Sequence, residues 1–147
     1  MSEPNGSAAA IVRAMQVGLG TAAVADCAMT VVSTVVSRPA RNRVIFDAGS
    51  KTLSSDGARG FAEMPGFGLV LRDLENPTPD PSIVIERLSE EHGTARVPEN
   101  CSLAVGDRVR ILPNHACVVT NLMDTLQLVN GMEIVNQLPV AARGKIW

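Results

Sequence analysis

The pattern of hydrophobic and polar positions predicts many strands and little helix. Residues 27–37 are rich in β-branched side chains and show no helical spacing of polar residues, which predicts a long strand. A turn over 38–42 leads to an apolar run at 44–46, which we expect to pair with the first strand as a hairpin. The β-branched positions of the first strand are Thr30, Val31, Val32, Thr34, Val35 and Val36.

Two more strands are predicted in the middle of the chain, at residues 67–71 and 83–87. The segment between them, residues 75–81, contains three prolines. Proline has no backbone N–H to donate to a ladder, so this segment is expected to be an exposed loop.

The last third of the chain also has the pattern of strands. Residues 107–112 alternate arginines with aliphatic side chains, as in a half-buried strand, and we expect the chain to continue extended through 118–120. The dipeptide Asn130-Gly131 lies between apolar runs within 126–135, which is a strong hairpin signal. The last strand is expected to end near residue 140.

The remaining segments set the domain boundaries. Residues 1–16 are expected to form a poorly ordered N-terminal tail, and residues 17–147 a single β-domain. Residues 50–60 are polar and glycine-bearing, which predicts a loop with one helical turn. Seven or eight short strands with little helix predict a mainly β fold, either a barrel or a sandwich.

Composition narrows the possible partners and the compartment. A hydrophobic fraction of 46% with 19% charged residues is that of a globular protein. A net charge of −2, with three Phe, one Trp and no Tyr, argues against nucleic acid as a partner. Three irregularly spaced cysteines are no disulfide framework, and neither a secretory leader nor a membrane-spanning run is recognised, so we expect a cytoplasmic protein without a membrane partner.

Candidate metal chemistry is concentrated at His115 and Cys117. If strand geometry resumes after Pro113-Asn114, these residues share the inward face of the preceding strand, because residues i and i+2 lie on one side. An imidazole and a thiolate that converge on one point suit zinc, and two protein ligands leave coordination positions open. The alternative is an ordinary strand end with a buried thiol.

Six segments, in the same order, resemble the C-terminal domain of the D-threonine aldolase and D-serine dehydratase family. The resemblance extends roughly from Val17 to Trp147. The segments are residues 34–39, 47–56, 88–93, 113–117, 121–122 and 139–145.

The resemblance implies the alanine-racemase C-terminal-like β-domain of fold-type III pyridoxal-phosphate (PLP) enzymes. In that family PLP is held by a (β/α)8 barrel, and a metal lies near the hydroxyl group of a D-3-hydroxy amino acid. The family's two protein ligands map onto His115 and Cys117, for zinc or another divalent metal. The His-x-Cys pair resembles the dehydratase form, whereas residues 47–56 look more like the aldolase branch, so aldolase and dehydratase lyase activities both stay open.

Two other residues are candidates for a catalytic or metal-binding role. Lys51 suggests a Schiff base, but the resemblance places the cofactor lysine in a different, N-terminal domain, and a lone loop lysine is usually solvated. His92 beside Glu90 and Glu91 suggests a general base or a third ligand, but a polar turn is the favoured interpretation. No catalytic or cofactor-binding residue is therefore assigned in this chain.

No PLP barrel is recognised in the sequence, so the chain is expected to be inactive without a PLP barrel domain or subunit as partner. The alternative is a non-catalytic β-domain, a truncated or split-enzyme fragment that serves assembly or binds a small ligand. In either case the apolar surface that a barrel would cover predicts a homodimer.

Overall fold

The computed structural model describes residue 17 and residues 19–57, 65–75 and 78–145. The expected tail over 1–16 lies outside the described residues. In this described part of the chain, eight strands and three short helices make up the regular structure, and the expectation of a mainly β fold with little helix is confirmed. The elements are η1 (Val24–Asp26), β1 (Val31–Ala40), β2 (Arg43–Phe46), α2 (Ser50–Leu53), β3 (Leu69–Leu71), β4 (Pro79–Leu88), β5 (Gly93–Arg96), β6 (Arg108–Leu112), α3 (Ala116–Leu122), β7 (Thr125–Asn130) and β8 (Glu133–Pro139).

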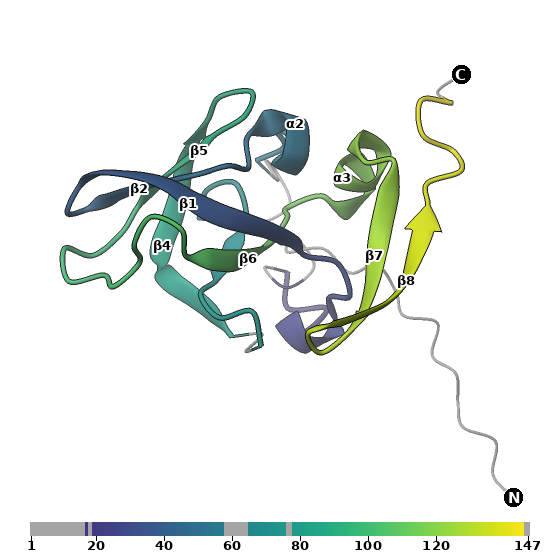
Figure 1. Cartoon of the computed structure of the whole chain (residues 1–147), viewed down its shortest axis with the longest axis horizontal. Coiled ribbons are helices and arrows are strands. Elements are labelled where there is room, and N and C mark those ends of the chain that lie inside the picture. Colours follow the sequence, from purple (N-terminus) through teal and green to yellow (C-terminus); the bar gives the residue numbers. More distant parts are fainter. Residues whose placement is uncertain (1–16, 18, 58–64, 76–77, 146–147) are drawn as a thin grey trace, which may run out of the picture.

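Six strands form a closed antiparallel barrel in the order β1-β2-β5-β4-β3-β6 (Figure 1). The pairing of β1 with β6, in which Val31 lies opposite Ile111, closes it. Side chains of one parity along each strand point inward, and closure leaves the barrel no unpaired edge. The barrel is filled by Val35, Val44, Phe46, Val70, Ile83, Ile85, Ala95, Val109 and Ile111, with Ala48, Leu53, Val97, Cys101 and Leu103 completing the same cluster.

A second, smaller cluster lies outside the barrel wall. Leu71 and Leu112 are buried, although they follow the inward-facing Val70 and Ile111 and so point outward. Val24 and Cys27 of the N-terminal segment pack on them. This contact explains why the chain adopts the 3₁₀ turn η1 before β1, and why the first strand begins at residue 31 and not at residue 27 as predicted.

Strand β4 begins at Pro79, so the prediction of a loop over 75–81 is wrong for its second half. Pro79 lies opposite Leu71 of β3, and the pairing of β4 with β5 begins only at Val84. The start of β4 therefore has a partner on one side, where proline can sit because the missing N–H leaves no ladder bond unmade. In the same way β1 runs through Pro39 to Ala40, and only residues 41–42 form the expected turn.

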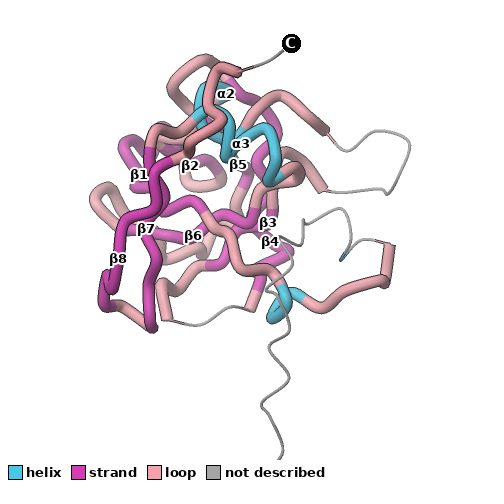
Figure 2. The backbone as a smooth tube through the Cα atoms, turned by 90° about the vertical axis from the view of Figure 1, so that its right-hand side faces the viewer, coloured by secondary structure: helices cyan, strands magenta, loops and turns pink. Residues whose placement is uncertain are grey.

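The β7–β8 hairpin predicted at Asn130-Gly131 is confirmed. Figure 1 shows the hairpin beside the barrel, on its right, and Figure 2 views the molecule from that side; nearly all residues of the hairpin are exposed. Within the described part of the chain, no helix has the length and hydropathy to cross a bilayer.

Candidate metal centre

The candidate site follows strand β6. The chain leaves the barrel wall at Leu112, passes Pro113 and Asn114, and enters helix α3. Ala116 and Val119, three positions apart, are the buried residues of this helix, and α3 lies beside α2 (Figure 1). The expected extended segment at 118–120 is thus helical. Burial of this apolar face, together with a hydrogen bond from Thr120 Oγ1 to the Ala116 carbonyl, outweighs the β propensity of Val118, Val119 and Thr120.

The helix changes the expected geometry of His115 and Cys117. His115 is the N-cap residue, with extended dihedral angles (φ −136°, ψ 94°), and Cys117 lies in the first turn. The prediction that both lie on the inward face of one strand is therefore wrong. Cys117 is exposed because the opposite side of the helix is the buried one, whereas the His115 side chain is 23% exposed.

The His115 ring is bound to a carboxylate that the sequence did not single out. Nδ1 of His115 lies 2.6 Å from Oδ2 of Asp56, whose side chain is 36% exposed. A carboxylate in this position favours the tautomer in which Nδ1 carries the proton, which leaves the Nε2 lone pair available to a ligand. Asp56 belongs to the family-like segment 47–56, but no local pattern distinguishes it from the other polar residues there.

Asn114 connects this segment to the end of β6. It is 1% exposed, and its Nδ2 donates to the carbonyls of Asp56 (3.2 Å) and Gly66 (2.9 Å). Nothing in the sequence showed that this asparagine would be buried, because the two carbonyls that it binds are 58 and 48 residues away in the chain.

Two of the family-like segments, 47–56 and 88–93, lie against each other. Backbone hydrogen bonds join Ser50 N to Ser89 O (2.8 Å) and Lys51 N to Glu90 O (3.1 Å). A Cβ on Gly49 would lie 2.4 Å from the Glu90 carbonyl oxygen, so the close approach requires glycine. This packing anchors α2, from which the chain runs to Asp56.

The other candidates of the sequence lie apart from this contact. Lys51 is exposed and pairs with Glu90 (2.9 Å) and Glu91 (2.7 Å), and hydrogen bonds to Glu91 and then Glu90 raise the pKa of its amine. His92 is exposed in the polar turn between β4 and β5. Among the described residues no group of three or more His, Cys, Asp or Glu side chains forms a metal cage.

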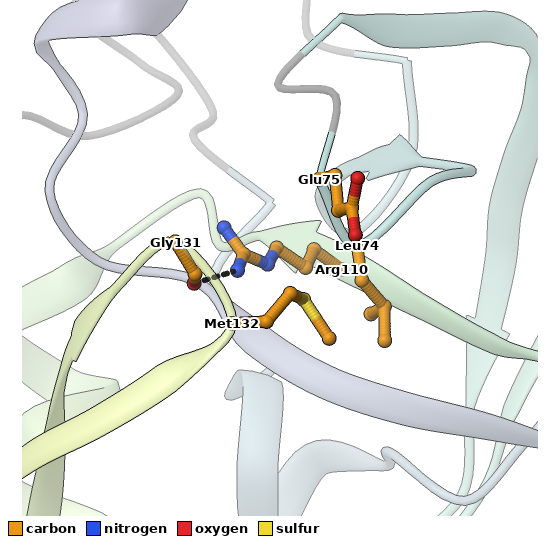
Figure 3. Close-up of a pocket in the computed structure, with 5 residues that line it drawn as sticks. All are labelled: Leu74, Glu75, Arg110, Gly131 and Met132. Carbon is orange, nitrogen blue, oxygen red and sulfur yellow. Dashed lines mark hydrogen bonds between the residues drawn. The ribbon is translucent and has the colours of Figure 1, made fainter.

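A cavity of about 410 Å³ lies elsewhere, between the β7–β8 turn and the outer face of β6 (Figure 3). Arg110 crosses it and donates to the carbonyl of Gly131 at 3.3 Å, while Met132, Leu74 and Glu75 complete the lining. The cavity does not include His115 or Cys117, so it is distinct from the candidate metal centre.

Comparisons with known proteins agree with the fold and the motifs. A protein of Mycobacterium tuberculosis, itself named only as uncharacterized, is 39% identical over 137 residues, which cover 90% of this chain and 96% of that protein. An alanine racemase-like protein from Idiomarina loihiensis has a TM-score of 0.71 at 24% identity, over 79% of this chain and 32% of the other, which confirms the alanine-racemase-like fold.

D-threo-3-hydroxyaspartate dehydratase from Delftia sp. HT23 superposes with a TM-score of 0.76 at 27% identity, over 92% of this chain and 37% of that enzyme. Two further solved structures are variants of a D-threo-3-hydroxyaspartate dehydratase. In one, alanine replaces a histidine, and in the other it replaces a cysteine two positions later; the cysteine variant was solved in the metal-free form. This chain thus spans about a third of the length of the solved structures that it matches.

The family model described as a putative serine dehydratase domain matches residues 28–129. With this match and these relatives, the chain belongs to the D-serine dehydratase and D-threonine aldolase family that its motifs resemble.

Proposed function

We propose that this chain is the metal-binding β-domain of a PLP-dependent lyase for D-3-hydroxy amino acids, with His115 and Cys117 as the protein ligands of a divalent metal. The observation that carries the proposal is the orientation of His115. Its Nδ1 is hydrogen-bonded to Asp56 at 2.6 Å, so the lone pair of Nε2 is available to a ligand. The His-x-Cys spacing is also that of the two residues altered in the D-threo-3-hydroxyaspartate dehydratase variants.

The donor set fits zinc. A thiolate favours a borderline-soft cation over magnesium or calcium, and an imidazole nitrogen suits the same metals. Cys117 is exposed and His115 is partly so, so an ion can reach both from solvent. When bound, such an ion supplies Lewis-acid polarisation of a hydroxyl group. Both loss of the 3-hydroxyl group and cleavage of the bond between carbons 2 and 3 of a 3-hydroxy amino acid require this polarisation.

In this proposal the residues of the chain bind and orient, and PLP comes from another domain or subunit. The open coordination positions are left for water and for a substrate that the partner presents. Alone, the chain is therefore expected to bind metal and to lack lyase activity. Dehydratase activity is the stronger candidate, because the His-x-Cys pair matches a dehydratase.

The decisive measurement is the zinc content of the purified chain by elemental analysis, with Cys117→Ser and His115→Ala alongside. We expect near-stoichiometric zinc in the parent chain and its loss in both variants, because each removes one of two protein ligands. Cys27→Ser is the matched control, since Cys27 packs on Leu71 and Leu112 outside the barrel wall and should leave zinc unchanged. If Cys117→Ser retains the parent's zinc content, the ligand assignment is wrong.

The second candidate function, a non-catalytic domain for assembly or small-ligand binding, is favoured by the cavity at Arg110 and by the exposed apolar hairpin. Mixing the chain with a PLP barrel domain of this family separates the two candidates. Lyase activity that appears in the complex and is lost with Cys117→Ser supports the first, whereas a stable complex that stays inactive supports the second.

A further inference from the structure

The Asp56 carboxylate is held by a backbone that is fixed on both sides. The Asp56 amide donates to Ser54 Oγ at 3.2 Å, and its carbonyl accepts from the buried Asn114 amide at 3.2 Å. Ser54 is itself 5% exposed and has a positive φ of 61°, a conformation that costs energy in a residue with a side chain and so needs support from its surroundings. The carboxylate is thus presented by a residue whose backbone is hydrogen-bonded at both its amide and its carbonyl.

The same asparagine fixes both partners of the contact. Asn114 directly precedes His115 and binds the carbonyl of Asp56, so one buried amide sets the position of the histidine relative to the carboxylate. It also binds the carbonyl of Gly66, which brings the chain on the far side of residues 58–64 to the same place. A contact supported in this way is preorganised before any ligand arrives.

We propose that Asp56 is a positioning residue that holds His115 in the Nδ1–H tautomer, with Nε2 unprotonated and directed to the metal. The inference deepens the proposed function, on which its metal-binding part rests. It assigns no contact of Asp56 with the metal or the substrate. Asp56 acts through the imidazole ring, by accepting a hydrogen bond from its protonated nitrogen.

The tautomer can be measured without metal. In ¹⁵N NMR spectra of the metal-free chain at mildly alkaline pH, where an imidazole is neutral, we expect the proton of His115 on Nδ1. His92, the other histidine, is exposed and serves as an internal reference for an imidazole without this carboxylate. In Asp56→Ala we expect the tautomer populations of His115 to shift toward those of His92.

Zinc binding supplies the second readout. Asp56→Ala is expected to weaken zinc affinity by about 10- to 100-fold, the usual effect of losing a carboxylate that orients a ligating histidine. Asp73→Ala, at an exposed aspartate between β3 and β4, is the matched control and should leave both the tautomer and the affinity unchanged. Should Asp56→Ala fold poorly, Asp56→Asn keeps the shape, lacks the charge and should show an intermediate effect.

The outcomes separate the two proposals. A parent chain that shows the Nδ1–H tautomer but binds no zinc supports the role of Asp56 and contradicts the proposed function. A parent chain with His115 protonated on Nε2, or an Asp56→Ala variant with parental tautomer and zinc affinity, overturns the inference. In the latter case His115 and Cys117 can still be the ligands.

Discussion

The side chain of Asn114 joins two distant segments of the chain to the end of β6. Its amide nitrogen is buried and binds two carbonyls, those of Asp56 and Gly66. We expect Asn114→Ala to lower the free energy of unfolding by about 3 kcal/mol, because it leaves two carbonyls without their donor. Urea denaturation measures this, with Asn136→Ala on the exposed hairpin as the control, expected within about 0.5 kcal/mol of the parent. Equal effects of the two substitutions would contradict this role.

Asp47 gives the fold a dependence on pH. Burial by itself raises the pKa of this carboxyl, but hydrogen bonds from the Thr34 amide and the Ser33 hydroxyl, both at 2.7 Å, outweigh it and hold the pKa below its ordinary value. A carboxyl with a lowered folded-state pKa contributes stability that is present above its unfolded pKa and is lost as the pH falls through the folded one.

We therefore expect Asp47→Asn to be less stable than the parent at neutral pH and to lose less stability than the parent as the pH falls below about 4. Near that pH an aspartate of the unfolded chain takes up a proton, so the parent begins to lose the contribution of its folded carboxylate. Urea unfolding at a series of pH values measures both effects. If the free energy of unfolding falls as steeply at acidic pH in Asp47→Asn as in the parent, other carboxyls dominate the loss of stability in acid.

At the scale of elements, the β7–β8 hairpin depends on the barrel for its position. The guanidinium of Arg110, on the outer face of β6, donates to the carbonyl of Gly131 in the hairpin turn (Figure 3). A two-stranded hairpin is marginally stable alone, so a single contact of this kind matters to its local stability.

We expect Arg110→Met to speed amide hydrogen exchange in β7 and β8, while exchange in the barrel strands changes little, and to cost about 1 kcal/mol for the lost hydrogen bond. Arg108→Met is the matched control, because Arg108 is an exposed arginine on the same face of the same strand. If hairpin exchange is the same in both variants, the contact with Gly131 does not hold the hairpin.

At the scale of the whole molecule, the hairpin presents an apolar surface to solvent. We call this surface the hairpin patch. Exposed apolar side chains that are concentrated on one element mark surfaces that associate with another protein, and on this chain the partner can be a second copy or a PLP barrel. Its members are Leu128, Val129, Met132, Ile134, Val135 and Leu138, each between 44% and 61% exposed.

We expect the isolated chain to form a homodimer in sedimentation experiments, and Ile134→Lys to weaken it, since Ile134 is 61% exposed within the hairpin patch. Val105→Lys is the control: Val105 is 62% exposed but lies before β6, outside the patch, so the dimer should persist. A parent chain that stays monomeric at high concentration contradicts the prediction, and an equal loss of dimer in both variants would place the interface elsewhere.

What the sequence by itself determined is local or compositional. The β1–β2 and β7–β8 hairpins follow from β-branched runs around short turns, and the mainly β class follows from their number. The six family-like segments were sufficient to recognise the family. Such signals come from neighbouring residues in the chain, so they can be recognised without knowledge of the fold.

Tertiary structure decided everything that depends on a distant partner. Residues 116–122 are helical because Ala116 and Val119 are buried, against the preference of Val118, Val119 and Thr120 for strands. Pro79 enters a strand because β4 has one neighbour there. Asp56 contacts His115, 59 residues away in the chain, because the buried Asn114 binds both chain segments. Neither hydrophobic periodicity nor local spacing encodes which polar groups a fold brings together.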